Sequence, residues 1–197
     1  MTYNQMSPNP SLTAEPLSEK TWPLFADLMG PKGGCGGCWC MNYRCEKRDF
    51  ESGKAGMNRT SLQALVAQGQ PVGVLLLLDQ KAVGWVSVAP RTAFPRLGKS
   101  RVLRSGLSGK GWSITCLFVR QAFRGQHLGK VLVQEACRYA FLHGAEWVEG
   151  FPTRPGGKTL PPPFLWKGLP SMFLSNGFEL LTPESQHQWV VVKKALS

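Results

Sequence analysis

The stretch WSITCLFVRQAFRGQHLGKVLVQEACRYAFLHGAEWVEGFP, residues 112–152, changes its pattern of side chains twice. Residues 112–119 are rich in β-branched and aromatic side chains, which is typical of a strand. A basic loop with two glycines follows, and apolar residues then recur at helical spacing from Leu128 until Gly144 ends the pattern. Residues 146–152 again have the composition of a strand. The order strand, loop, helix, strand predicts two parallel strands joined by a right-handed crossover.

The rest of the chain predicts further helices and antiparallel strands around this unit. Amphipathic spacing indicates the helices, and Ser18 is the expected N-cap of the first one. Two apolar, β-rich runs separated by a polar turn near Asp79 predict a hairpin. In chain order, the expected elements are helices at 18–30 and 58–70, strands at 72–80 and 81–90, a helix at 169–178, and strands at 178–183 and 188–196.

Together these elements place the chain in the α/β class. We expect a mixed, mostly antiparallel twisted sheet flanked by helices, with one parallel strand–helix–strand crossover. At 197 residues the chain is long enough for one domain with a substantial core. The polar, proline-broken start predicts a flexible tail at 1–17, which leaves 18–197 as a single domain.

Charge and composition limit the classes of partner. The formal net charge is +11, so the expected partners are anionic: nucleic acid, an acidic membrane surface or a polyphosphate group. The longest unbroken apolar run, Val74 to Leu78, is far shorter than the ~20 residues of a membrane-spanning helix. The first residues lack the basic and apolar pattern of a leader, so we expect a cytoplasmic protein without a membrane partner.

The loop Arg124–Lys130 has the composition of an anion-binding site. A helix N-terminus offers up to four unpaired main-chain N–H groups and the positive end of the helix dipole. A phosphate placed there gains several hydrogen bonds, and small residues such as Gly125 and Gly129 let the backbone approach it. The alternative is an ordinary helix start with surface basic residues, since neither GxxxxGK[ST] nor GxGxxG is present.

The same residues carry a resemblance to a known family. A strand, then V-x-x-x-x-R-G-x-x-x-G, then a helix with an aliphatic pair resembles the acyl-CoA loop of the GNAT superfamily of N-acetyltransferases. The loop pattern of that family is [R/Q]-x-x-G-x-[G/A]; Arg124 and Gly129 occupy its ends, and His127 stands at its usual middle glycine. The order of elements over about 18–196 is similar as well, and the sequence GGCWCM at 36–41 is similar to one branch of the family.

The resemblance implies an enzyme that uses acetyl-CoA as co-substrate and transfers the acetyl group to an amine. In such enzymes the strand before the loop parts from its neighbour and binds the pantetheine arm through main-chain groups, while the loop amides bind the pyrophosphate. An amide of Phe118 or Val119 would polarise the thioester carbonyl. By position, the resemblance implies cofactor-binding groups at Leu117, Phe118, Val119, Arg124, Gly125, Gln126, His127, Leu128, Gly129 and Lys130.

Two positions bear on proton transfer. Glu149 lies in the apolar strand at 146–152, where partial desolvation would favour its protonated form and suit it to act as a base. The alternative is a glutamate that pairs with a neighbouring arginine or faces solvent. The tyrosine that often donates a proton in the GNAT superfamily falls, in register, at Phe173, which cannot donate. Three alternatives follow. The thiolate leaves without a proton donor; a cysteine, Ser171 or water replaces the tyrosine; or the enzyme has lost its activity.

Four cysteines crowd the loop GGCGGCWCMNYRC at 33–45, and three interpretations remain open. The first is a zinc site, because C-x-x-C is a zinc-binding spacing, although no second such pair follows. The second is an acceptor-substrate wall, which the GNAT layout implies. The third is a glycine-rich loop whose thiols pack against the core. The candidate zinc ligands are Cys35, Cys38, Cys40 and Cys45, and the candidate substrate residues are Cys38, Trp39, Cys40 and Met41.

We therefore expect an N-acetyltransferase that acts on a small-molecule amine by direct attack in a ternary complex. The net positive charge disfavours a polycationic acceptor, and nucleic acid is not the expected partner. The alternative is a catalytically inactive GNAT scaffold that binds acyl-CoA or nucleic acid, which Phe173 favours. A third reading is a zinc-bearing, RNA-binding module. The acceptor and the oligomeric state stay open, a homodimer included.

Overall fold

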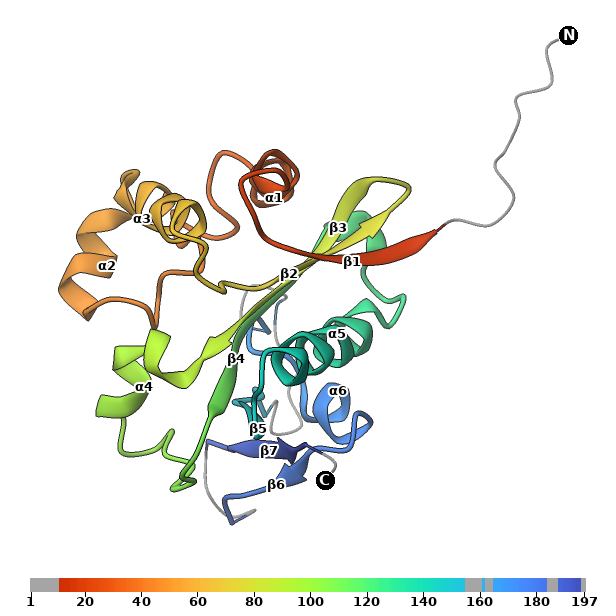
Figure 1. Cartoon of the computed structure of the whole chain (residues 1–197). Coiled ribbons are helices and arrows are strands. Elements are labelled where there is room, and N and C mark those ends of the chain that lie inside the picture. Colours follow the sequence, from red (N-terminus) through yellow and green to blue (C-terminus); the bar gives the residue numbers. More distant parts are fainter. Residues whose placement is uncertain (1–10, 155–160, 162–164, 184–187, 196–197) are drawn as a thin grey trace, which may run out of the picture.

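A computed structural model describes residues 11–154, 161, 165–183 and 188–195. Its strands form one sheet in the order β1-β2-β3-β4-β5-β7-β6 (Figure 1). β4 and β5 are parallel, and the other neighbours in that order are antiparallel. This topology confirms the predicted mixed sheet with one parallel crossover. The strands are β1 (Leu12–Pro16), β2 (Val74–Leu78), β3 (Lys81–Pro90), β4 (Gly111–Val119), β5 (Trp147–Gly150), β6 (Glu179–Leu180) and β7 (Val191–Lys194).

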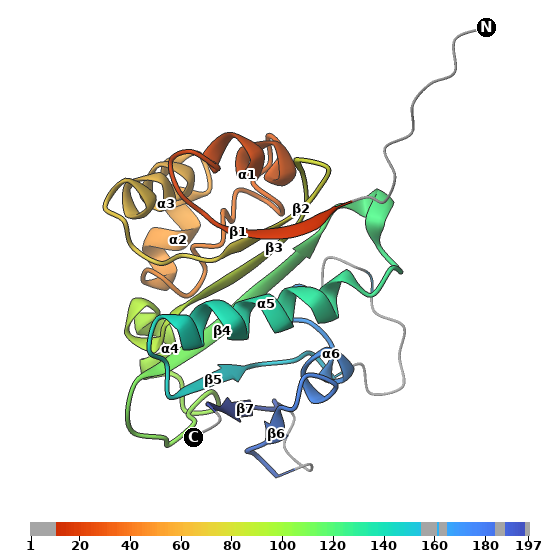
Figure 2. The same ribbon diagram turned by 45° about the vertical axis from the view of Figure 1, so that its right-hand side comes forward.

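Helices cover both faces of the sheet. α1, α2 and α3 gather on one face, and α5 and α6 lie on the other (Figure 1; Figure 2). The helices are α1 (Trp22–Met29), α2 (Lys47–Gly53), α3 (Met57–Ala67), α4 (Pro95–Lys99), α5 (Leu128–Leu142) and α6 (Pro170–Leu174), with short 3-10 helices η1 (Arg91–Ala93) and η2 (Gln121–Phe123). The predicted helices and strands are therefore present, most of them with shorter bounds.

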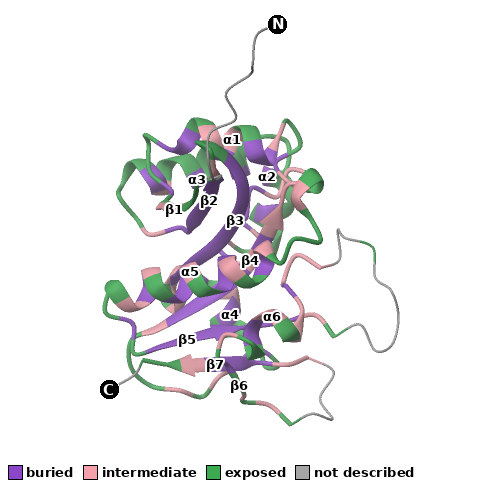
Figure 3. Ribbon diagram, turned by 90° about the vertical axis from the view of Figure 1, so that its right-hand side faces the viewer, coloured by how far each residue is buried: buried purple, intermediate pink, exposed green. Residues whose placement is uncertain are grey.

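Each face of the sheet has its own core. On one face, α5 packs across β2, β3 and β4 through residues that recur at helical spacing, among them Leu132, Ala136 and Ala140. On the other face, the rings of Phe25 and Trp85 meet with their centroids 4.7 Å apart. Because both faces are covered, β2 and β3 are buried along most of their length (Figure 3).

The N-terminal segment corrects the predicted tail. Residues 12–16, placed in the tail by the sequence, form β1, which pairs with β2 at one edge of the sheet. Residues 1–10 of that tail lie outside the described residues. None of the five residues of LTAEP is buried, and the strand is held at the sheet edge by its pairing with β2. The start of α1 is also corrected: Thr21, not Ser18, is its N-cap residue, and Ser18 bonds to Thr21 in the preceding turn.

Two short helices, α2 and α4, had no counterpart among the expected elements. Each one buries a single large apolar side chain, Phe50 in α2 and Leu97 in α4. One apolar residue cannot produce a helical period, so the pattern of the sequence gives no signal there. α4 lies in the segment at 91–110, which joins β3 to β4. Leu97 packs with Phe94 and Phe151 in a third, small core.

β4 parts from β5 at a defined place, which we call the fork. Pairing between the two strands ends with Ile114 opposite Gly150. At the same point β4 carries an extra residue relative to β3, because Cys116 lies opposite Ser87 and Ile114 opposite Val88. The extra residue, Thr115, is thus a β-bulge, and bulges bend a strand and end its pairing. The fork is therefore bordered by β4 beyond Ile114 and by the chain that follows Gly150.

Candidate functional site

The loop between β4 and α5 changes direction just before the helix begins. Gly125 and His127 both have positive φ angles, 80° and 59°, and these reverse the chain just before the helix. Glycine adopts this conformation without strain, whereas histidine does so less readily. His127 therefore occupies a glycine-like conformation, and it does so at the position where the GNAT pattern has its middle glycine.

Five successive amides at this helix start are unpaired. Within the described part of the chain, no acceptor receives a hydrogen bond from the N–H groups of residues 125–129. The amide of Lys130 is different, because it donates to the His127 carbonyl oxygen at 2.9 Å. The predicted set of amides from Gly125 to Lys130 is therefore one residue too long. What remains is a row of donors at the positive end of a 15-residue helix.

Gly125 and Gly129 are glycines for different structural reasons. A methyl group at Gly125 would meet nothing within 4 Å, so this glycine is required by its φ angle alone. A methyl group at Gly129 would lie 2.8 Å from Met172 Sδ, so this glycine lets α6 approach α5. Gly129 is buried, while Gly125, Gln126 and His127 are exposed.

Two arginine side chains near the loop donate hydrogen bonds to main-chain carbonyl oxygens. Arg124 Nε donates to the Val119 carbonyl oxygen at 3.1 Å, which places its guanidinium group beside the end of β4. Arg120 bonds to the Ala82 carbonyl oxygen and to Asp27, 2.5 Å from Oδ2. Arg124 and Lys130 are both exposed, so they can add positive charge around the unpaired amides.

Alternate residues of β4 face the fork. Arg120 N–H donates to the Val83 carbonyl oxygen across the β3 side, and main-chain direction alternates along an antiparallel strand. Phe118 lies opposite Trp85, and its main-chain N–H and C=O therefore face β3. The main-chain N–H and C=O of Leu117 and Val119 face the fork. Of the three predicted β4 residues, Leu117 and Val119 thus turn their main-chain groups to the fork, and Phe118 does not. The Leu117 amide already binds a carbonyl oxygen, that of Trp166, at 2.6 Å.

Glu149 is completely buried and belongs to an ion pair. Its Oε1 accepts hydrogen bonds from Arg91 Nη1 and, at 2.6 Å, from Ser113 Oγ. Its Oε2 has no partner among the described residues. An adjacent guanidinium group favours the charged carboxylate. The geometry therefore matches the arginine-paired alternative rather than the predicted base. Arg91 was missed because it lies far from Glu149 in the sequence and no local pattern links them.

The four thiols of the cysteine loop do not form a group of metal ligands. Among the described residues, no three Cys, His, Asp or Glu side chains come together as a metal site, so the structure gives no support to the zinc interpretation of Cys35, Cys38, Cys40 and Cys45. Cys35 is exposed, whereas Cys40 is buried and accepts a hydrogen bond from Trp85 Nε1 at 3.1 Å. A hydrogen bond with Cys116 lowers the pKa of Cys40, and the buried Arg44 guanidinium group acts in the same direction.

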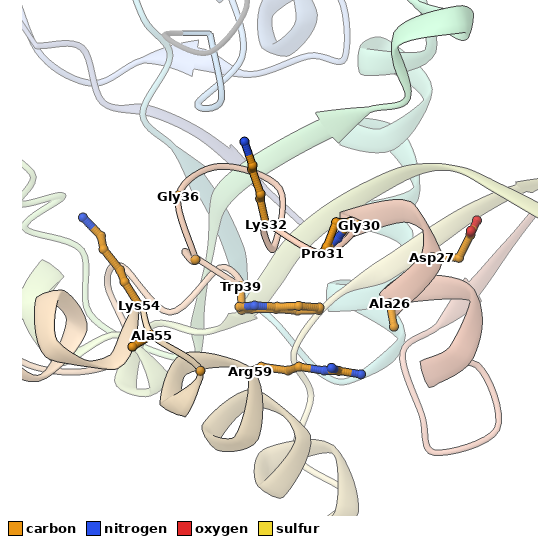
Figure 4. A pocket seen from close by; sticks show the side chains of 12 residues that line it. Ala26, Asp27, Gly30, Pro31, Lys32, Gly36, Trp39, Lys54, Ala55 and Arg59 are labelled. Atoms are coloured by element: carbon orange, nitrogen blue, oxygen red, sulfur yellow. The ribbon is translucent and has the colours of Figure 1, made fainter.

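Trp39 lines a cavity of about 720 Å³ between α1, the cysteine loop and the start of α3. Figure 4 shows its ring lying flat against the Arg59 side chain, whose guanidinium carbon is 5.2 Å from the ring centroid. Lys32, Lys54 and Asp27 also line the cavity. Of the four predicted substrate residues, only Trp39 lines it; Cys38 is half-buried, and Cys40 and Met41 are buried in the core.

Phe173 lies in the core below the fork. Its ring is fully buried and meets the Phe178 ring edge-on, with the centroids 5.2 Å apart. The residue at the usual tyrosine position therefore contributes packing. In the described part of the chain, no helix is long and apolar enough to cross a bilayer.

Solved structures of acetyltransferases share this fold. PaiA N-acetyltransferase from Thermoplasma acidophilum, in complex with coenzyme A, aligns with 94% of this chain and 99% of its own (TM-score 0.51, 13% identity). YhbS from Escherichia coli, in complex with CoA, aligns with 97% of this chain and 85% of its own (TM-score 0.51, 14% identity). A mosquito arylalkylamine N-acetyltransferase, like 5b, aligns with 94% and 100% (TM-score 0.53, 13% identity). At these identities the likeness establishes the fold.

Sequence comparison establishes the family. No curated protein matches the chain. Residues 40–153, however, match the family model described as Acetyltransferase (GNAT) family, and this match covers more than half of the chain. It includes the bulged strand β4, the row of unpaired amides and the whole of α5. The chain therefore belongs to the acetyltransferase (GNAT) family, whose fold supports acyl transfer from acyl-CoA to an amine.

Proposed function

We propose that the chain transfers the acetyl group of acetyl-CoA to the amine of a small-molecule acceptor, by direct attack in a ternary complex. The observation that carries the proposal is the row of unpaired amides over residues 125–129 at the start of α5. A diphosphate placed there would accept several main-chain hydrogen bonds and lie at the positive end of the helix dipole. Arg124 and Lys130 would neutralise the remaining charge.

The fork supplies a donor for the thioester carbonyl. From the diphosphate, the pantetheine arm would extend along the fork-facing edge of β4 toward Leu117. The Leu117 N–H donates to the Trp166 carbonyl oxygen at 2.6 Å, so this position already accommodates a carbonyl oxygen. A fixed donor at this point would stabilise the negative charge that develops on the thioester oxygen.

Proton transfer would depend little on side chains at the fork. Phe173 cannot donate a proton to the departing thiolate, and Glu149 is held by Arg91. Coenzyme A thiolate is a fair leaving group, and an acceptor that binds as the neutral amine needs no buried base. Catalysis would then rest on positioning and on the polarised carbonyl.

The acceptor is expected to be neutral or anionic apart from its amine. The cavity beside Trp39 has three basic residues, Lys32, Lys54 and Arg59, against one acidic residue, Asp27. The same loop reaches β4, because a methyl group at Gly34 would lie 3.9 Å from the Phe118 ring. A positive surface at the acceptor side disfavours polycations such as polyamines.

The test is acetyl transfer from acetyl-CoA to a panel of amines, with the acetylated product detected by mass. The panel would contain amino acids, arylalkylamines, amino sugars and polyamines at equal concentration. We expect product with at least one neutral or anionic amine and the lowest rates with polyamines. If acetyl-CoA protects the protein against heat but no amine is acetylated, the chain is an inactive scaffold that binds acyl-CoA.

A further inference from the structure

The fork between β4 and β5 is occupied by the chain itself. On the β4 side, Leu117 N–H donates to the Trp166 carbonyl oxygen at 2.6 Å. On the β5 side, Thr153 N–H donates to the Gly168 carbonyl oxygen at 2.8 Å. Main-chain bonds to both sides place residues 165–168 between the two strands, as a tight turn that the Gly168 N–H closes by donating to the Leu165 carbonyl oxygen at 2.8 Å.

Side-chain contacts hold this segment in place. The Trp166 ring meets the Tyr43 ring at a centroid distance of 6.0 Å. Lys167 Nζ donates to Gln188 Oε1 at 3.1 Å, and Gln188 Nε2 reaches the Pro152 carbonyl oxygen at 3.4 Å. The segment is thus tied to the cysteine loop on one side and to the chain after β5 on the other.

Gly168 fits the fork tightly. It has a φ angle of +77°, and a methyl group on it would lie 2.6 Å from Leu117 Cδ1 and 3.1 Å from a ring atom of Phe173. A side chain at this position would therefore strain the backbone and collide with the floor of the fork. The inserted arrangement depends on glycine here.

We propose that residues 165–168 are a built-in competitor of acyl-CoA, which must leave the Leu117 amide before the thioester can bind. This inference rests on the proposed function, because it takes the fork as the place of the thioester. The Leu117 amide has a single hydrogen and already binds a carbonyl oxygen at 2.6 Å. The thioester carbonyl needs the same donor and the same volume, so the two occupants exclude each other.

The competition lowers the measured affinity for acyl-CoA. When only a fraction of the protein has a free fork, the apparent dissociation constant equals the intrinsic constant divided by that fraction. The competitor is part of the same chain, so it acts at a high effective concentration. A substitution that disfavours the inserted segment without touching the loop amides must therefore tighten binding.

Gly168→Ala and Gly177→Ala form a matched pair for this test. Both glycines have a φ angle of +77°, so alanine strains the backbone equally at the two sites. At Gly177, however, the nearest atom to the added methyl group is Lys193 Nζ, 3.8 Å away and outside the fork. Titration calorimetry with acetyl-CoA should show about fivefold tighter binding for Gly168→Ala than for wild type, and a change of less than twofold for Gly177→Ala.

Hydrogen exchange on the wild-type protein gives an independent readout. In the described structure, the Thr153 amide donates to the Gly168 carbonyl oxygen, so its acceptor belongs to the segment. If acetyl-CoA expels the segment, exchange at the Thr153 amide speeds up while exchange at residues 125–129 slows. If the segment stays in place, exchange at Thr153 does not speed up.

The outcomes separate the inference from the proposed function. The competitor is overturned, and the function left standing, if the wild type binds acetyl-CoA but Gly168→Ala binds it no more tightly than Gly177→Ala. The same conclusion follows if acetyl-CoA does not speed up exchange at Thr153. If neither wild type nor Gly168→Ala binds acetyl-CoA, both proposals fail. Should Gly168→Ala not fold, Trp166→Ala replaces it, since loss of the Tyr43 contact must also tighten binding; unchanged or weaker binding there counts against the competitor.

Discussion

Glu149 lies where solvent does not reach it, and its carboxyl group contacts the Arg91 guanidinium group. The Arg91 side chain is one-fifth exposed and also donates to the Leu103 carbonyl oxygen at 3.0 Å. Burial of a charge is costly unless a partner compensates it, so each member of the pair depends on the other. The pair therefore joins η1 to β5, and Ser113 of β4 donates to the same carboxylate oxygen at 2.6 Å.

Glu149→Gln should destabilise the protein without abolishing turnover. Loss of the carboxylate leaves the Arg91 charge unpaired, which we expect to lower the free energy of unfolding by about 3 kcal/mol. Urea unfolding measures this, with the exposed Glu146→Gln as control, for which we expect a change below about 0.5 kcal/mol. A Glu149→Gln protein of normal stability whose kcat falls a hundredfold would instead identify Glu149 as the base.

Cys137 links stability to alkaline pH. Burial raises the pKa of its thiol from 9.0 to about 12 in the folded protein. Below pH 9 both states hold the proton, so the full stability is present; above pH 9 the unfolded thiol ionises while the folded one does not. At pH 10.5 this costs about 2 kcal/mol. Urea unfolding at pH 8 and pH 10.5 measures how far the free energy of unfolding falls with pH. We expect this fall to be about 2 kcal/mol smaller in Cys137→Ala than in wild type. An equal fall in both proteins would contradict the assignment to Cys137.

At the scale of elements, β5 and α6 pack closely because β5 has a glycine, Gly150, at the point of contact. Gly150 ends the paired part of β5, and a methyl group there would overlap the Phe173 ring. Phe173 is fully buried and cannot move aside into solvent. Gly150 and Phe173 therefore depend on each other: the ring of Phe173 fills the space that a side chain at residue 150 would need.

Gly150→Ala should destabilise the protein, although strand propensity alone predicts the opposite sign. Alanine in place of a strand glycine normally stabilises by roughly 0.5–1 kcal/mol, whereas an overpacked core costs about 1–3 kcal/mol. We expect the second effect to dominate, measured as a lower midpoint in thermal unfolding. Phe173→Leu in the Gly150→Ala background should recover part of the loss. A Gly150→Ala protein that is more stable than wild type would show that this packing is loose.

Elements with a strong period were predictable, and elements defined by tertiary contacts were not. The start of α5 followed from glycine, histidine and the apolar spacing after Leu128, because capping and amphipathicity are local. β1 was missed because none of its residues is buried and its pairing with β2, which is distant in sequence, defines it. The occupation of the fork by residues 165–168 depends on Leu117 and Thr153, which are distant in sequence. For the same reason the sequence could offer Glu149 as a base but could not name Arg91 as its partner.

At the scale of the whole molecule, one sheet brings the candidate site together from distant parts of the chain. The row of amides and the bulged strand come from one continuous unit, while the cavity beside Trp39 comes from the N-terminal helices on the opposite face from α5. Family membership accounts for the acyl-CoA side of this arrangement. The net charge of +11 fits a polyanionic co-substrate without selecting an acceptor.

The proposed function requires that the amides of residues 125–129 bind a diphosphate, and titration calorimetry tests this directly. Acetyl-CoA, its 3′-dephospho derivative and S-acetylpantetheine share the thioester, but the last lacks the diphosphate. We expect the two nucleotides to bind within about tenfold of each other and S-acetylpantetheine to bind at least a hundredfold more weakly, a loss of about 3 kcal/mol or more. Equal affinity for acetyl-CoA and S-acetylpantetheine, or no heat with any of the three, would contradict the account.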